Sequence, residues 1–215
     1  MKLTKYEHAC FTVEKDGKLL VVDPGVFTTD LPALENVIAV VVTHVHPDHF
    51  DPNALEALFA SNPEMIVYSP SEVDNEINSA YSHMAVQPGE ALTVGPFSLE
   101  FFGGKHVRVH GTLTPQFANV GVMINDVLYY PGDSFDLPPN DRKIAWLALP
   151  VSGPWLRVGE VMDFVLATNA ERAFYTHDAL WSQNSQTFEK SYIGLAAEKT
   201  GLKIESLTSP IEIDG

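Results

Sequence analysis

The pattern of apolar and polar positions predicts that the chain opens with strands. Residues 2–14 and 18–22 contain β-branched and aromatic side chains, and the pair Asp16-Gly17 between them is a hairpin turn signal. Residues 37–42 form a continuous apolar run, mostly β-branched, which is typical of a strand buried on both faces. We therefore expect an antiparallel opening that leads into a buried strand.

A helix is predicted directly after residue 51. Asp51 is a suitable N-cap, and Pro52 suits the first helical position because its fixed φ is already helical. Leu55, Leu58 and Phe59 follow at helical spacing and form an apolar stripe. The junction between the strand at 37–42 and this helix is therefore held by a regular element on each side.

Further helices and strands follow at similar intervals. Helical patterns cover residues 70–81, 159–168 and 185–199, and short apolar strands cover 65–68, 92–94, 97–102, 119–124, 127–130, 144–150 and 173–176. In the last helix we place Phe188, Tyr192, Leu195 and Ala196 on one apolar face, with Gly201 as the C-cap. This order predicts an α/β (α+β) fold in which two sheets are covered by helices, and one domain over residues 1–215, since no linker or repeat divides it.

Composition and charge limit the classes of partner. The 215 residues are 45% apolar and 19% charged, which is ordinary for a globular protein. The net charge of -15 would repel a polyanion, so we expect no nucleic acid partner. The longest apolar runs fall far short of the roughly 20 residues of a membrane helix, and the N-terminal residues lack a signal-peptide core. We expect a cytoplasmic protein without a membrane partner, in which the single cysteine, Cys10, is a buried thiol.

The run His44-Val45-His46-Pro47-Asp48-His49 is the strongest chemical signal in the chain. It places three imidazoles and one carboxylate within six residues, immediately after the strand at 37–42. Nitrogen and oxygen ligands of this kind suit a borderline cation such as zinc. The alternative, a polar loop that is rich in histidine without binding metal, does not explain its place between a buried strand and a capped helix.

Three later residues stand just beyond apolar strands. His106 follows the strand at 97–102 and two glycines, Asp133 follows 127–130, and His177 follows 173–176. Side chains in this position converge at the carboxyl ends of strands in α/β folds. His110 competes with His106, because residues four apart in an extended segment project to the same side. We favour His106, directly behind the glycines. His110 is then a substrate contact, the proton donor to a leaving group, a solvated histidine, or one that contacts a metal ligand without binding the metal.

With these residues the chain resembles the metallo-β-lactamase superfamily over its full length. The resemblance implies a four-layer αβ/βα sandwich with a dinuclear site at the shared edge of its sheets. By the family pattern, one metal would be held by His44, His46 and His106, the other by Asp48, His49 and His177, with Asp133 bridging. Asp23 would orient a ligand by hydrogen bonding. The opening His8-Ala9 and the run Val21-Val22-Asp23-Pro24 are most similar to lactonase-like hydrolases related to ascorbate 6-phosphate lactonase.

Departures from other members of the superfamily reduce the number of reactions to be expected. β-Lactamases commonly have another residue in place of His49, which disfavours antibiotic hydrolysis. Flavodiiron proteins carry glutamate in place of His46, which disfavours redox di-iron chemistry. Glutathione-thioester hydrolases usually follow the motif with a pair of glycines, where this chain has Phe50-Asp51. Glu7 stands where many lactonase-like relatives have glycine, so the substrate of the best-known lactonase does not carry over.

The resulting functional hypothesis is a metal-dependent hydrolase of a small molecule. Two divalent metal ions, Zn before Mn or Fe, would share a bridging hydroxide that attacks an ester, lactone or phosphodiester. Asp48, Asp133 and His110 are the candidate catalytic residues, with His110 as proton donor. The rival hypotheses are an iron-dependent oxidoreductase of the same fold and a non-catalytic metal-binding module. The sequence is also compatible with a homo-oligomer.

Other polar and aromatic residues near these segments receive structural assignments. His8 lies either at the rim of the site or in a structural hydrogen bond, and His83 is expected at the surface. The acids Asp136, Asp141 and Asp178 are taken as structural. Trp155 and Trp181 either pack against substrate or, as we favour, in the core or loops. Substrate specificity is expected in the loops 105–116, 134–142 and 153–157.

Overall fold

Two seven-stranded sheets form the centre of the molecule, which is described by a computed structural model over residues 1–140 and 142–214. Asp141, assigned a structural role above, lies outside these ranges. In order across the sheet, the first contains β14 (Ile211–Glu212), β1 (Lys2–Lys5), β2 (Phe11–Lys15), β3 (Lys18–Val22), β4 (Val37–Val41), β5 (Ile66–Ser69) and β6 (His83–Ala85). The second contains β13 (Lys203–Glu205), β12 (Ala170–Thr176), β11 (Ile144–Pro150), β10 (Leu128–Tyr130), β9 (Val120–Ile124), β8 (Phe97–Gly103) and β7 (Ala91–Val94).

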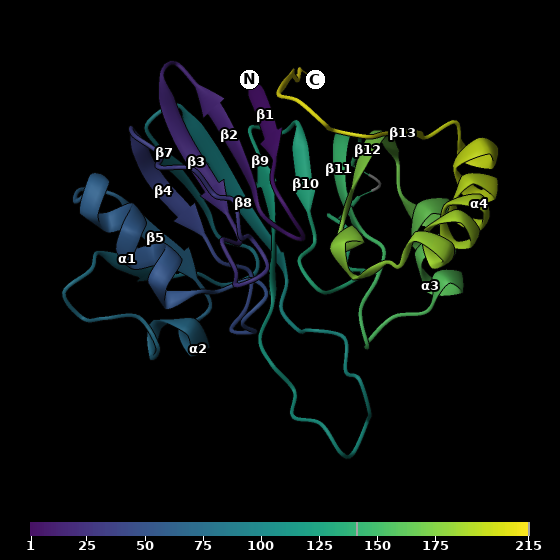
Figure 1. Cartoon of the computed structure of the whole chain (residues 1–215), viewed down its shortest axis with the longest axis horizontal. Coiled ribbons are helices and arrows are strands. Elements are labelled where there is room, and N and C mark those ends of the chain that lie inside the picture. The colour runs from purple at the N-terminus through teal and green to yellow at the C-terminus, as the bar shows by residue number, and fades with distance from the viewer. Residues whose placement is uncertain (141, 215) are drawn as a thin grey trace.

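Helices cover the outer face of each sheet. The helices α1 (Pro52–Ser61) and α2 (Ser71–Asp74) lie beside the first sheet, and α3 (Val158–Ala167) and α4 (Gln183–Thr200) beside the second (Figure 1). One apolar cluster fills the space between the sheets, and two others lie between each sheet and its helices. The expected α/β sandwich of two helix-covered sheets is therefore confirmed.

Aromatic side chains hold the two sheets together. Phe11, from β2, packs edge-on against Tyr130 and Phe174 of the second sheet, with ring centroids 5.6 Å apart in both pairs. All three rings are fully buried. An aromatic side chain buries roughly 150–250 Å² of surface. The three packed rings therefore fix the distance between the two sheets, and with it the distance between the loops that follow their strands.

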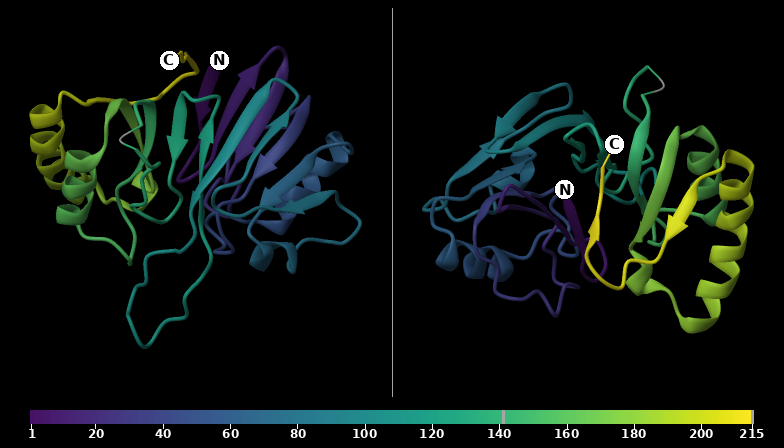
Figure 2. Two further views of the ribbon diagram at one scale, coloured as in Figure 1. Left: turned by 180° about the vertical axis from the view of Figure 1, so that it is seen from behind. Right: turned by 90° about the horizontal axis from the view of Figure 1, so that it is seen from above.

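The chain termini lie together at the end of the sandwich opposite the loops after β4 and β10 (Figure 1). After β13 the chain crosses from the second sheet to the first, where β14 pairs with β1 (Figure 2). The amino group of Met1 also donates to the carbonyl of Ile213 at 2.9 Å. The last residues therefore link the edges of the two sheets at the end away from the loops.

Local turn and cap signals are confirmed. Asp16 and Gly17 have φ of 51° and 72° and join β2 to β3 in the predicted hairpin. The Asp51 side chain accepts the N–H of Asn53 at 2.9 Å and caps α1. Gly201 ends α4 in the left-handed conformation with φ of 79°. Each of these signals depends on neighbours in sequence, which explains why sequence reasoning found it.

The predicted strand over residues 2–14 is wrong, because β1 and β2 are separate antiparallel strands. The chain reverses between them, with the N–H of Tyr6 donating to the carbonyl of Cys10 at 2.9 Å and His8 at φ 55°. The reversal contains no glycine, so it lacks a turn signal. Cys10 is fully buried, as predicted, and burial raises the pKa of its thiol.

Two helix predictions also differ from the structure. The helical pattern at 70–81 yields only α2, Ser71–Asp74, followed by turns. The predicted apolar face of α4 is wrong for Phe188, Tyr192 and Leu195, which are exposed. The helix instead buries Ile193, Ala196 and Ala197, because the small alanine side chains allow close packing on this neighbouring stripe. Three short edge strands, β6, β13 and β14, have no counterpart among the predicted strands.

Among residues 1–140 and 142–214, the structure has no helix long and apolar enough to cross a membrane.

Candidate metal centre

The residues His44 to His49 form a tight turn between β4 and α1. The N–H groups of His49 and Phe50 both donate to the carbonyl of His46 at 3.0 Å, so the segment folds back on itself. Gly25 packs so closely that a Cβ on it would lie 2.0 Å from the Asp48 carbonyl oxygen. The predicted strand-to-helix junction thus brings the whole motif to one end of the first sheet.

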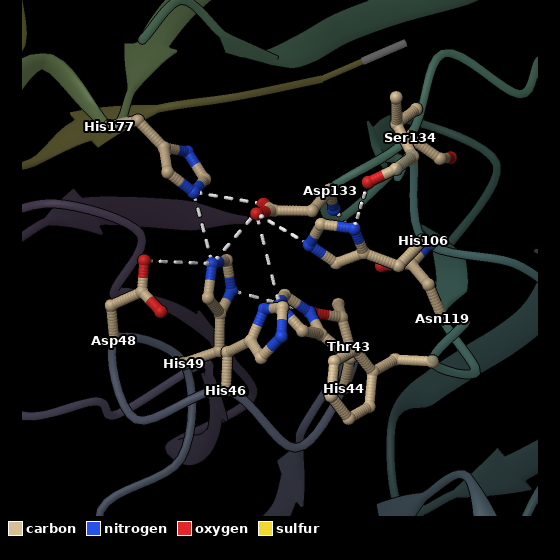
Figure 3. A network of polar contacts seen from close by, with 12 residues as sticks. Thr43, His44, His46, Asp48, His49, His106, Asn119, Asp133, Ser134 and His177 are labelled. Atoms are coloured by element: carbon tan, nitrogen blue, oxygen red, sulfur yellow. Dashed lines mark hydrogen bonds and ion pairs between the residues drawn. The ribbon is translucent and has the colours of Figure 1, made fainter. Parts of the chain in front are cut away.

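Three strands of the second sheet supply the remaining residues from the opposite side (Figure 3). His106 follows β8 through Gly103 and Gly104, whose φ values are 81° and 136°. Asp133 follows β10 through Gly132, at φ 64°, and His177 follows β12 with its own φ at 64°. A left-handed residue turns the chain sharply at each strand end, so these side chains face the His44–His49 turn.

The side chains form two adjoining groups of possible metal ligands. The first ligand group is His44, His46, His106 and Asp133, and the second ligand group is His8, Asp48, His49 and His177. Within each group the ligand atoms lie within 4.8 Å of one another. All seven residues that the sequence nominated as ligands belong to one group or the other, and His8 joins them.

Asp133 lies between the two groups. Its Oδ2 is 3.2 Å from the Nε2 atom of His106, and its Oδ1 is 2.9 Å from Nε2 of His177 and 3.2 Å from Nε2 of His49. The carboxyl is almost fully buried, yet Oδ1 has no hydrogen-bond partner of suitable geometry among the described residues. A buried carboxylate oxygen without a hydrogen bond, facing imidazole nitrogens, fits a position for a divalent cation.

Burial and charge set the protonation of this cluster. Burial raises the pKa of Asp133, but His177 and His49 outweigh it and hold that pKa well below its usual range. Burial and the nearby His49 hold the pKa of His44 well below its ordinary value. Burial also lowers the pKa of His49, but Asp133 and Asp23 reverse this and raise it well above the ordinary value. The carboxylate is therefore ionised and His44 neutral, the forms that bind metals.

Asp23 orients His49 from behind. Its Oδ2 is 2.6 Å from Nδ1 of His49, and both side chains are fully buried. The N–H of Thr43 donates to Oδ1 of Asp23 and its hydroxyl donates to Oδ2, both at 2.7 Å. Because Nδ1 of His49 donates to this fixed carboxylate, Nε2 points to the centre of the site. Asp23 thus has the orienting contact that the family pattern implied.

Outer hydrogen bonds also fix other imidazoles. The Nδ1 atom of His106 bonds to the carbonyl of Val107, and Nδ1 of His44 lies 3.0 Å from the Thr43 hydroxyl. In both residues Nε2 is left facing the cluster. His46 differs, since its Nδ1 lies 3.1 Å from Nε2 of His44 and is the nitrogen that faces inward.

The structure distinguishes His106 from His110. His106 is buried in the first ligand group, whereas His110 is exposed on the long loop between β8 and β9. The N–H groups of Leu113 and Thr112 donate to Nδ1 of His110 at 3.2 and 3.3 Å, which turns the ring toward its own loop. This loop projects away from the sheets (Figure 1). The structure does not bring His110 into either ligand group.

Aromatic side chains wall the cluster. The Trp155 ring meets His106 and His177 edge-on, at centroid distances of 5.7 and 6.3 Å, and Phe117 packs against His46 at 4.6 Å. Trp155 thus contacts one member of each group, beyond the packing role predicted for it. Trp181 instead packs against Tyr175.

The other polar assignments can also be located. Asp178 forms an ion pair with Lys5 at 3.0 Å, Asp136 accepts the Tyr129 hydroxyl through its main-chain carbonyl, and His83 is exposed on β6. His8 is the member that sequence reasoning left undecided. Two signals pointed to it: the polar pair Glu7-His8 within an otherwise strand-like segment, and the resemblance of the opening His8-Ala9 to lactonase-like hydrolases.

Comparisons with known proteins agree with this geometry. Residues 2–177 match the family described as the beta-lactamase superfamily domain. The chain is 27% identical over 205 residues to protein Rv0786c of Mycobacterium tuberculosis, covering 93% of each protein. It is 28% identical over 145 residues to a UPF0173 metal-dependent hydrolase of Salinibacter ruber, covering 62% of each.

A solved structure shows the same architecture at lower identity. The metallo hydrolase Igni18 of Ignicoccus hospitalis superposes with a TM-score of 0.71 at 17% identity, covering 98% of this chain and 97% of that one. At this identity the likeness concerns the fold alone.

Proposed function

The chain belongs to the metallo-β-lactamase superfamily and is a metal-dependent hydrolase, and on that premise we propose that it cleaves a small-molecule ester, lactone or phosphodiester with two divalent cations. Zinc is the cation we propose first. Imidazole and carboxylate ligands without a thiolate also suit manganese and iron, so the metal is part of the proposal.

The position of Asp133 is the observation that carries the proposal. Its two carboxylate oxygens face different ligand groups, Oδ2 toward His106 and Oδ1 toward His49 and His177. A carboxylate placed in this way can bind one cation through each oxygen. The first ligand group would hold one cation and the second ligand group the other.

Cations bound at such a site supply Lewis acidity, which lowers the pKa of water and polarises a carbonyl or phosphoryl oxygen. The chain's own residues keep the site in the form that this chemistry needs. Asp23 holds Nε2 of His49 toward the centre, and Trp155 limits water on the side where it packs against His106 and His177.

Substrate access is proposed on the side of His46 and Asp48. These are the least buried members of the two groups: His46 is half-buried, and 24% of the Asp48 side chain is exposed, whereas the other six are buried. Because the remaining ligands are buried, this is the side from which we propose that a small molecule reaches the cluster. The net charge of -15 also disfavours a nucleic acid substrate.

The test is to measure metal content and hydrolysis on the same preparation. The protein is freed of metal with a chelator, reloaded separately with zinc, manganese or iron, and assayed against lactones, phosphodiesters and thioesters. We expect two equivalents of metal and hydrolysis that the chelator abolishes. Oxygen consumption by an iron-loaded protein that hydrolyses nothing would replace the proposal with an oxidoreductase. Two bound cations without turnover on any substrate would favour a binding module.

A further inference from the structure

His8 occupies an unusual position for a histidine. It is fully buried in the reversal between β1 and β2, with φ at 55°, a conformation that residues other than glycine adopt infrequently. Its ring packs edge-on against His177 at 4.4 Å and against Phe27 at 5.0 Å. The ring is therefore held on two sides by other rings and has little freedom to rotate.

Both polar links of His8 lead to the second ligand group. Nε2 of His8 lies 3.0 Å from Oδ2 of Asp48, and the His8 carbonyl accepts the N–H of His177 at 3.2 Å. Asp48 follows a strand of the first sheet, whereas His177 follows a strand of the second. His8 thus contacts both Asp48 and His177, which would bind the second cation from the two sheets.

The hydrogen bond between His8 and Asp48 determines which ring nitrogen of His8 carries the proton. An ionised carboxylate only accepts hydrogen bonds. The ring proton of His8 is therefore on Nε2, which donates a hydrogen bond to Asp48. Nδ1 is buried and has no hydrogen-bond partner among the described residues. The ring is therefore satisfied only through Nε2, at Asp48.

Asp48 is the ligand that most needs such a contact. Its side chain is 24% exposed, while those of His49 and His177 are nearly inaccessible. Apart from His8, the nearest ring nitrogen to Oδ2 is Nε2 of His49, at 3.7 Å. Without His8, the carboxylate could rotate toward solvent and away from the second ligand group.

We propose that His8 is a positioning residue for the second cation: it holds the Asp48 carboxylate through Nε2 and fixes the His177 main chain through its carbonyl, without being a ligand itself. This inference rests on the proposed function, because it assumes that a second cation binds.

The test compares two substitutions at His8 in the full-length protein. In His8→Gln the side-chain amide can donate to Asp48 from a similar position, whereas His8→Ala removes the donor. Metal-free protein is titrated with zinc by calorimetry, and cobalt loading is followed by its visible absorption. His83→Ala, at an exposed histidine outside both groups, is the matched control.

We expect two zinc ions to bind the wild-type protein and His83→Ala alike. His8→Ala should bind the first normally and the second about 10- to 100-fold more weakly, as expected for the loss of a residue that orients a ligand. His8→Gln should recover most of this loss and restore the cobalt spectrum.

Two results would overturn the inference. Equal affinity for both ions in His8→Ala would show that His8 has no role in binding. A loss in His8→Gln as large as in His8→Ala would identify His8 as a ligand instead. If His8→Ala fails to fold, the His8→Gln titration decides between recovery and loss. A wild-type protein that binds only one ion would contradict the proposed function itself, which distinguishes the two failures.

Discussion

Oδ2 of Asp23 lies 2.6 Å from Nδ1 of His49, and both side chains are fully buried. Asp23 comes from the end of β3 and His49 from the turn after β4, so the contact joins two neighbouring parallel strands of the first sheet. The shared partner Thr43 fixes both oxygens of the carboxylate. One carboxylate therefore determines which nitrogen of His49 faces the centre.

Asp23→Asn is predicted to weaken binding of the second cation by about 10- to 100-fold, because the amide supplies less negative charge to orient His49 and increase its basicity. Zinc titration of the metal-free variant measures the change. Asp51→Asn is the matched control, since this residue caps α1 and asparagine caps equally well. Unchanged affinity in Asp23→Asn would show that the 2.6 Å contact does not support metal binding.

His46→Ala and Asp133→Ala are each predicted to lower turnover by roughly a hundredfold or more, because removing a ligand costs at least as much as removing its supporting partner. His46→Ala should lose cation binding at the first ligand group only, whereas Asp133→Ala should weaken both. Metal content and circular dichroism are measured together, to separate lost ligands from lost fold. Full metal content and activity in both variants would exclude the two-cation proposal.

His110→Ala is predicted to leave metal content unchanged and turnover within about twofold of the wild-type rate. The reason is structural: Nδ1 of His110 accepts hydrogen bonds from its own loop, and the residue is exposed. A general acid typically contributes about 10²- to 10⁴-fold. A fall of that size in kcat with metal content retained would establish His110 as the proton donor and would require the loop to move during turnover.

Metal binding is predicted to release at least one proton at neutral pH, the one held by His49. Burial lowers the pKa of His49, but Asp133 and Asp23 raise it well above the ordinary value, so His49 is protonated before a cation binds and must lose this proton. His44 and His46 have lowered pKa values and bind without releasing one. Zinc affinity should therefore rise with pH up to the raised pKa of His49.

Calorimetric titrations in two buffers of different ionisation enthalpy, at the same pH, measure this release directly. The observed enthalpy should differ between the buffers by at least the ionisation enthalpy of one buffer proton. Identical enthalpies in the two buffers would mean that His49 is already neutral in the metal-free protein.

Much of the site could be predicted because its signals are local. The residues from His44 to His49 are neighbours in sequence, and Asp51 and Pro52 mark the following helix by their own chemistry. The later ligands were predicted from the apolar strands before them, since a strand directs the next residues to the end of its sheet.

The contacts that depend on which segments pack together could not be predicted. His106 and His110 stand four residues apart, so the same extended segment offers either one, and only the folded loop buries His106 and exposes His110. In α4, Phe188, Tyr192 and Leu195 form an apolar stripe as regular as that of Ile193, Ala196 and Ala197. Only close packing selected the second stripe for burial.

The sequence by itself determined the type of chemistry: a set of imidazoles and carboxylates at the ends of strands, with Asp23 behind them. The tertiary structure decided which nitrogen of each histidine faces inward, that Asp133 lies between the two ligand groups, and that His8 contacts Asp48 and His177. The physical reason is separation along the chain. The contacts of Asp133 and His8 join residues that are 27 or more positions apart in the chain, and only the packing of the strands and sheets sets their distances.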